Sequence, residues 1–271
     1  MALSAGALLD TQAAFDKVAA EYGEANARNP VLSGMRRRAM RCVVAHLPRG
    51  AHVLDLGCGP GLDDEELGQC GYEVTGLDWS PAMVAQARAR IDRAGLSDRV
   101  RIHHLGMHEL GQLSPVVFGG AYSNFGALNC VPDLPDVARQ LAARLRTGAP
   151  LVASVIGRVC PWEVALFLAK RDVARARIRF ADGFVPVPLD GCRVWTRYYT
   201  PAAFVRAFAP AGFVPQYVRA LGLLVPPPYL EHFAVRHARV VRALQVAEDV
   251  VAAWPGLRNW GDHFLVVLRK R

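Results

Sequence analysis

The chain has 271 residues, of which 52% are apolar and 21% are charged. This composition is close to the globular average and excludes a chain that is disordered throughout. The length predicts one large domain or two small ones, with enough buried surface for a core without disulfides. The net charge of +8 comes mainly from arginine, because only Lys17, Lys170 and Lys270 are lysines. We interpret this charge as a compositional bias rather than a surface built for a polyanion.

Cysteine spacing and the absence of long apolar runs indicate the compartment. Six cysteines stand at positions 42, 58, 70, 130, 160 and 192, without a C-x-x-C pair. In a core-rich chain this pattern is typical of a reduced protein. Residues 1–10 lack the basic and apolar regions of a signal peptide, and no apolar run reaches the roughly 18 residues of a membrane helix. We therefore expect a soluble, cytoplasmic protein without membrane insertion.

Strand-like and helical segments alternate along the chain. Strands are predicted at residues 53–56, 73–78, 100–104, 116–123, 150–156, 213–220 and 263–268. Helices are predicted at residues 10–47 with a break near 29–30, then from 63, and at 80–94, 133–145, 161–179, 200–212 and 229–253. This alternation predicts an α/β, Rossmann-like fold, with helices on both faces of a mostly parallel seven-stranded sheet.

Two segments interrupt the regular alternation, at residues 157–198 and 222–260. The first contains a proline-rich turn at 185–188 followed by a strand-like run at 193–199. We interpret both segments as insertions that form a cap over the core. The expected organisation is an N-terminal helical lid (1–47), core (48–156), first cap insertion (157–198), core (199–221), second cap insertion (222–260) and final core strand (261–271).

The strongest motif is the run Val53-Leu54-Asp55-Leu56-Gly57-Cys58-Gly59-Pro60-Gly61. Its three glycines let the backbone leave a strand in a tight turn and approach a ligand closely, with a helix N-terminus behind them. Asp78 ends the next strand, where a carboxylate can accept both ribose hydroxyls of a nucleoside. Leu62 stands where the dinucleotide pattern G-x-G-x-x-G requires glycine, which disfavours a dinucleotide.

Residues 54–61 resemble motif I of class I S-adenosylmethionine-dependent methyltransferases. Residues 15–22 resemble the F-D-x-x-A-x-x-Y helix of the small-molecule enzymes in this class, and residues 76–83 resemble their G-x-D-x-S-x-x-M motif. The resemblance covers residues 15–156 well and the final strands more loosely. It implies the class I methyltransferase fold, S-adenosyl-L-methionine as cofactor and S-adenosyl-L-homocysteine as product.

The resemblance also implies a cofactor site, position by position. The glycines would hold the methionine moiety and ribose, Asp78 would bind the ribose hydroxyls, and Trp79 and Met83 would flank adenine. Met107 stands where the family commonly has an acid for the adenine amine, so that contact would fall to the backbone or to His108. The implied cofactor-binding residues are Tyr22, Asp55, Gly57, Cys58, Gly59, Gly61, Asp78, Trp79, Met83, Gly106, Met107, His108, Ser123, Asn124 and Phe125.

The acceptor site is expected beside the loop that follows the fourth strand. Enzymes of this class that methylate base amines often carry two prolines where this chain has Phe125-Gly126, which argues against a nucleic-acid base. The two cap insertions are rich in aromatic residues, which predicts a pocket for a small, largely apolar organic molecule.

Candidate general bases lie in the two cap insertions. His232, His237 and Tyr199 are the candidates, with Tyr198 and Glu163 as weaker alternatives. His232 and His237 are five positions apart on a predicted helix, so at most one of them can face the site.

Two other groups of charged residues leave their roles open. Histidines 103, 104 and 108 lack a convergent carboxylate or thiolate partner, so no metal site is predicted. Arg36, Arg37 and Arg38 form a basic run on a helix, where one of them could meet the cofactor carboxylate or an anionic acceptor.

The favoured function is methyl transfer from S-adenosylmethionine to oxygen, nitrogen or carbon of a small molecule, as in secondary metabolism. Two alternatives stay open: a cofactor-binding enzyme with non-methylating chemistry such as cyclisation, and a nucleic-acid-modifying methyltransferase. Only the net charge favours the nucleic-acid enzyme. The arginines are spread along the chain rather than clustered, which argues against a surface that binds phosphate groups. The sequence identifies neither the acceptor nor the oligomeric state, monomer or homodimer.

Overall fold

The computed structural model describes residues 3–271, in which seven strands form one sheet of order β3-β2-β1-β4-β5-β9-β8. Its strands are β1 (His52–Leu56), β2 (Glu73–Asp78), β3 (Val100–His104), β4 (Gly120–Ser123), β5 (Pro150–Ile156), β8 (Phe213–Leu221) and β9 (His263–Lys270). β9 runs antiparallel to β5 and β8, whereas the other pairs are parallel. The predicted mostly parallel seven-stranded sheet is confirmed.

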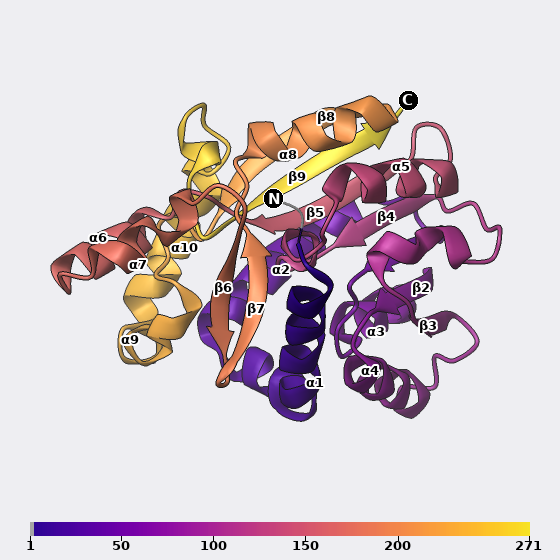
Figure 1. The fold of residues 1–271 in the computed structure, drawn as a ribbon, viewed down its shortest axis with the longest axis horizontal. Coiled ribbons are helices and arrows are strands. Elements are labelled where there is room, and N and C mark those ends of the chain that lie inside the picture. Colours follow the sequence, from indigo (N-terminus) through magenta and orange to yellow (C-terminus); the bar gives the residue numbers. More distant parts are fainter. Residues whose placement is uncertain (1–2) are drawn as a thin grey trace.

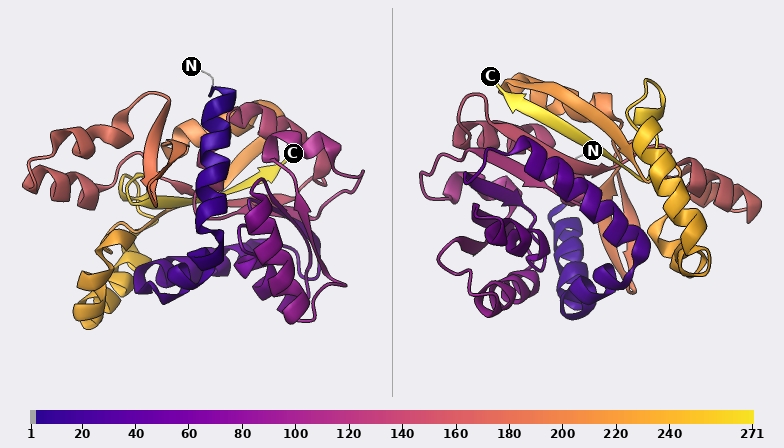
Figure 2. Two further views of the ribbon diagram at one scale, coloured as in Figure 1. Left: turned by 60° about the horizontal axis from the view of Figure 1, so that its bottom comes forward. Right: turned by 180° about the vertical axis from the view of Figure 1, so that it is seen from behind.

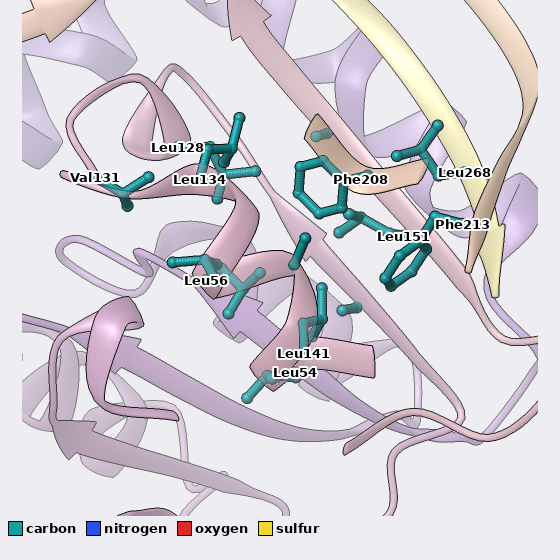
Figure 3. Close-up of a cluster of buried hydrophobic side chains, with 14 of the residues drawn as sticks. Leu54, Leu56, Leu128, Val131, Leu134, Leu141, Leu151, Phe208, Phe213 and Leu268 are labelled. Atoms are coloured by element: carbon teal, nitrogen blue, oxygen red, sulfur yellow. The ribbon is translucent and has the colours of Figure 1, made fainter. Parts of the chain in front are cut away.

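Helices cover both faces of the sheet (Figure 1). One face packs against α5 (Leu134–Arg144) and α8 (Pro201–Phe208), and Figure 3 shows the apolar cluster between them and the strands. The other face packs against α2 (Pro30–His46), α3 (Leu62–Gln69) and α4 (Pro81–Arg93). Side chains of β1 alternate between the two clusters, as the period of a strand requires, with Leu54 on one face and Val53 on the other.

The N-terminal segment forms two helices that meet at Asn29. The Asn29 side chain accepts hydrogen bonds from the backbone N–H groups of Val31 and Leu32 and so caps α2, whose first residue is a proline. The preceding helix α1 (Ala5–Arg28) packs against α4 and against strand β7 (Cys192–Arg197). The predicted break near residues 29–30 is confirmed, and its cause is this cap.

The first insertion differs from its prediction in two places. Instead of one helix over 161–179, α6 (Pro161–Ala169) and α7 (Val173–Arg177) are separated by a turn, because Asp172 caps α7 by accepting from the N–H of Arg175. Figure 2 shows these helices extending away from the sheet. The expected proline-rich turn is strand β6 (Phe184–Leu189), paired antiparallel with β7. Pro186 and Pro188 are exposed, as prolines of an edge strand can be.

The second insertion also contains two helices rather than one, α9 (Glu231–Arg236) and α10 (Ala238–Val251). Each of these two helices is attached to a different part of the chain. Asn29 donates to the Pro228 carbonyl at 2.8 Å and so holds the start of α9 at α2. Glu248 of α10 instead accepts from the N–H groups of Gly222 and Leu224, both at 2.9 Å. These separate attachments explain the break at His237, which lies outside helical geometry.

None of the helices in the described part of the chain combines the length and the apolar character needed to cross a membrane.

Glu248 offers a test of how the second insertion is anchored. Because Glu248→Ala removes a buried charged acceptor from three backbone N–H groups, it should lower the free energy of unfolding by about 2–3 kcal/mol. Urea unfolding followed by circular dichroism measures this loss. Glu248→Gln keeps an acceptor oxygen and should lose less. An Ala variant as stable as the wild-type protein would show that Glu248 does not anchor the segment.

Candidate cofactor and acceptor site

A cavity of about 370 Å³ opens at the carboxyl ends of β1 and β2, beside the glycine-rich loop. Gly57 and Gly59 have φ angles of 88° and 53°, a region that favours glycine. A Cβ atom on Gly59 would meet no atom within 4 Å, so the loop backbone is open to the cavity there. A Cβ on Gly57 would instead come to 2.4 Å from the Ala127 side chain. The glycines therefore serve both close ligand approach and packing.

Asp78 connects this loop to the end of β2. Its Oδ2 atom accepts from the Gly59 N–H at 2.8 Å and its Oδ1 atom accepts from the Ser80 N–H at 2.9 Å. Burial raises the pKa of Asp78 above its ordinary value, although both backbone donors favour the charged form. Trp79 lies beside it, and its ring meets His108 edge to face with centroids 5.3 Å apart. Two carboxylate oxygens with remaining lone pairs thus lie next to an aromatic wall.

Most of the predicted cofactor residues come together in this cavity. Its lining includes Tyr22, Gly57, Cys58, Gly59, Asp78, Trp79, Met83, Gly106, Met107, His108, Asn124 and Phe125. The prediction needs correction for Asp55, Gly61 and Ser123, which are not part of the wall. Ser123 donates to the Leu56 carbonyl at 2.7 Å, and a Cβ on Gly61 would press on Ala87 of α4 at 3.0 Å. These residues support the loop from below because their side-chain positions face the protein interior.

Arg36 and Asp63 complete the wall beside the loop. They form an ion pair, and the Asn124 side chain donates to the second oxygen of Asp63 at 2.7 Å. The Arg36 guanidinium lies 5.1 Å above the Phe125 ring centroid. The sequence left the role of Arg36 open and predicted position 63 only as the start of a helix. The position of Asp63 two residues after Gly61 is the signal that could have identified it.

The three neighbouring arginines have separate environments. Arg36 faces the cavity, whereas Arg37 is exposed to solvent. Arg38 is buried and pairs with Asp249 of α10 at 2.9 Å. The basic run is therefore neither a uniform solvated face nor a single anion site.

A largely apolar wall continues the cavity beyond the loop. It is formed by α1, by the loop after β4 and by the hairpin of β6 and β7. The side chains from these segments include Leu8, Phe15, Phe125, Val187, Leu189, Val194 and Thr196, and Ile156 at the end of β5 joins them. His263, the first residue of β9, also lines the cavity.

Several solved structures share this fold. A Burkholderia thailandensis 1,6-didemethyltoxoflavin-N1-methyltransferase, solved with 1,6-didemethyltoxoflavin and S-adenosylhomocysteine, matches with a TM-score of 0.61 and 19% identity, covering 100% of this chain and 92% of that one. The cyclase SpnF matches with a TM-score of 0.57 and 17% identity, covering 86% and 80%. At these identities the likeness shows the fold alone.

Sequence comparison adds the family. A family model described as a methyltransferase domain matches residues 53–148, which hold the glycine-rich loop and Asp78. Residues 53–148 form a methyltransferase domain. A ubiquinone biosynthesis O-methyltransferase from Xanthomonas axonopodis pv. citri (strain 306) is 30% identical over 154 residues, or 54% of this chain and 62% of that protein. The match thus spans less than two thirds of this relative.

The candidate general bases need correction. His232 and His237 are exposed, and neither lines the cavity of the methyltransferase domain. The whole second insertion, residues 222–260, contributes nothing to this wall, because its contacts with α2 and with the end of β8 hold it elsewhere. Tyr199 is buried against Phe204, and burial raises its pKa to about 12. Only the first insertion reaches the cavity, through β6 and β7.

Glu163 and Tyr198 belong to a buried ion-pair network behind this wall. The Arg179 guanidinium donates to Asp262 at 2.6 Å, contacts Glu163, and lies 5.1 Å from the Tyr198 ring centroid. Cys160, Glu163 and Asp262 have ligand atoms within 4.8 Å of one another, a spacing that could suit a metal ion. However, Arg179 already supplies the positive charge between the two carboxylates. We therefore interpret this cluster as an ion-pair network.

Two further carboxylates lie beneath the glycine-rich loop. Burial and the nearby Asp63 raise the pKa of Asp64 to about 8, and burial likewise raises the pKa of Asp55 well above its ordinary value. The Tyr122 hydroxyl donates to Asp64 at 3.4 Å. One oxygen of each carboxylate has no hydrogen-bond partner among the described residues. We therefore expect this pair of carboxyl groups to hold a proton. The proton prevents repulsion between two negative charges beneath the glycine-rich loop.

This pair predicts a pH-dependent stability. Asp64 ionises near pH 3.8 when exposed and near pH 8 when folded. Between these values the unfolded state binds fewer protons than the native state, so this contribution to stability falls as pH rises. Asp64→Asn should flatten the decline of the melting temperature between about pH 5 and pH 8. Calorimetry at both pH values measures it, with Asp98→Asn as an exposed control. An unchanged decline would show that Asp64 is not the group responsible.

Proposed function

We propose that the chain transfers a methyl group from S-adenosylmethionine to a small, largely apolar organic acceptor. The observation that carries this proposal is the composition of one cavity wall. The glycine-rich loop and Asp78 of the methyltransferase domain form one part of it, and apolar side chains from α1 and from the β6–β7 hairpin form another. A donor and an acceptor can therefore meet in one cavity.

The residues at the end of β2 fit the adenosine part of this cofactor. Asp78 keeps lone pairs for two ribose hydroxyls, since each of its oxygens accepts only one backbone hydrogen bond. Trp79, Met83 and Met107 supply apolar surface for adenine. The open space above Gly59 is the place where the ligand approaches the backbone most closely.

The charged residues beside the loop fit the amino-acid part. Arg36 would hold the carboxylate, and Asp63 together with the Asn124 side-chain oxygen would hold the ammonium group. That oxygen is buried and has no hydrogen-bond partner among the described residues. Arg36 and Asp63 neutralise each other, so their pair matches a zwitterion better than a polyphosphate. S-adenosylmethionine supplies an activated methyl group, which leaves alignment, water exclusion and proton removal to the protein.

The acceptor follows from the apolar wall. Its side chains offer few polar groups, as sites for small organic molecules do. The relative named as an O-methyltransferase supports oxygen as one possible acceptor atom. Cyclisation is the second candidate, since the fold is shared with a cyclase. We do not favour nucleic acid as a partner. We propose a cytoplasmic location, which the six free cysteines support because they are typical of a reducing compartment.

The first test is cofactor binding. S-adenosylmethionine or S-adenosylhomocysteine should raise the melting temperature, since a ligand at about 100 times its Kd adds about 2.7 kcal/mol to the stability of the native state. NAD and ATP should not, because the only cavity arginine described is neutralised by Asp63. Differential scanning fluorimetry measures these shifts. No shift with either sulfur nucleoside at millimolar concentration would contradict the cofactor assignment.

The second test concerns the ribose contact. Asp78→Ala should weaken S-adenosylhomocysteine binding about 10- to 100-fold, because hydrogen bonds to a charged acceptor are worth about 1.5–3 kcal/mol each. Gly59→Val should weaken binding as well, by placing a side chain in the open space above the loop. Isothermal titration calorimetry measures both, with Asp98→Ala as a surface control. Unchanged affinity in folded Asp78→Ala would exclude the ribose role.

A further inference from the structure

We propose that His263, oriented by Asp262, removes the proton of a hydroxyl group on the acceptor during methyl transfer. The inference rests on the proposed function and names the acceptor class of the same cavity. It starts from strand direction. Because β9 is antiparallel to its neighbours, its first residue lies at the carboxyl edge of the sheet, where His263 pairs with Ile156 of β5 and Leu221 of β8.

The position of the imidazole is well defined. The His263 side chain is only 9% exposed and lines the cavity. Its ring packs edge to face on Phe125, with centroids 5.9 Å apart. Phe125 belongs to the loop after β4, and Arg36 covers the same ring. His263 therefore lies on the cavity wall next to the residues that we assign to the amino-acid part of the cofactor.

A hydrogen bond defines which ring nitrogen can act. Nδ1 of His263 lies 3.1 Å from Oδ2 of Asp262. An ionised carboxylate only accepts, so Nδ1 carries the hydrogen and Nε2 keeps a free lone pair. No group among residues 3–271 forms a hydrogen bond with Nε2. Asp262 is not part of the cavity wall whereas His263 is, and we therefore assign Nε2 to the cavity side of the ring.

The groups that pack behind this imidazole are two carboxylates and one guanidinium. Burial would raise the pKa of Asp262, but the Arg179 guanidinium and His263 hold it well below its usual range. Arg179 also pairs with Glu163, whose pKa burial raises. With both carboxylates ionised, the network of Glu163, Arg179 and Asp262 carries one surplus negative charge beside His263. On the opposite side, Arg36 and Asp63 cancel each other.

This arrangement suits a hydroxyl better than an amine. A neutral amine attacks with its lone pair and can lose its proton to water afterwards, whereas a phenol or enol becomes a strong nucleophile only as its proton leaves. As the acceptor oxygen bonds to the methyl carbon, the carbon–sulfur electron pair stays on sulfur and Nε2 takes the hydroxyl proton. The products are a methyl ether, S-adenosylhomocysteine and an imidazolium that returns its proton to water.

The first experiment reads the imidazole itself. Nitrogen-15 NMR of histidine-labelled protein with S-adenosylhomocysteine should show the tautomer with hydrogen on Nδ1, and His263→Gln identifies the signals. Asp262→Asn should shift this population toward hydrogen on Nε2. A wild-type protein with hydrogen mainly on Nε2, or an unchanged population in Asp262→Asn, overturns the proposal. The same spectrum can be recorded without ligand, so this result does not depend on the cofactor assignment.

The second experiment uses a matched pair of apolar probes, 4-tert-butylphenol and 4-tert-butylaniline, with S-adenosylmethionine as donor. His263→Gln should lower kcat for the phenol by about 10²–10⁴-fold and abolish the acid limb of its pH profile. Transfer to the aniline and S-adenosylhomocysteine affinity should stay within about threefold. His103→Ala, on an exposed position of β3, is the matched control.

The outcomes separate the two proposals. Equal losses on both probes in His263→Gln would reveal a packing role, and an unchanged phenol rate would show that no base acts at this position. Wild-type transfer to the aniline alone, or to neither probe, overturns the hydroxyl assignment. Failure of the wild-type protein to bind S-adenosylhomocysteine contradicts the proposed function instead.

Discussion

The direction of β9 is the constraint on which the site depends. A strand inserted antiparallel between β5 and β8 must begin at the carboxyl edge, where the parallel strands end. The chain enters it through Gly261, whose φ of 139° and backbone contacts near 3 Å leave no room for a side chain. Asp262 is then held by backbone bonds to Gly157 and Gly222, at 2.9 and 3.0 Å. Backbone geometry therefore places the Asp262 carboxylate and the His263 imidazole at the carboxyl edge of the sheet. The parallel strands end at this edge, whereas β9 begins there.

Charged side chains around the cavity lie next to an opposite charge or hold a proton. Arg36 pairs with Asp63, Arg179 lies between Glu163 and Asp262, and the carboxylates beneath the loop hold a proton. Burying a charge is costly unless a partner or a pKa shift neutralises it, so this pattern is what buried charged side chains require. The net charge of +8 is consequently not concentrated around the cavity. Composition alone could not distinguish a polyanion surface from paired arginines inside the molecule.

The sequence predicted those elements whose conformation is determined by residues adjacent in the chain. The glycine-rich loop, Asp78 and the seven strands belong to this class, because turn chemistry and apolar periodicity determine them. The sequence could not show that His232 and His237 lie away from the cavity, because the placement of their segment depends on contacts of Glu248 and Arg38 with residues distant in the chain. The strand β6 was missed because its prolines indicate a turn unless the partner strand is known. His263 could have been found, since a predicted final strand that runs antiparallel must begin at the site.

The proposed donor and acceptor parts of the cavity share one structural element, α1. A two-stranded sheet such as β6–β7 is marginal alone and needs a packing partner. That partner is α1, where the Thr11 hydroxyl accepts from the Trp195 N–H at 3.0 Å. One residue later, Gln12 donates to the Trp79 carbonyl at 2.8 Å, beside the proposed adenosine position. Packing of α1 therefore positions the β6–β7 hairpin and the end of β2 together, because adjacent residues of one helix contact both.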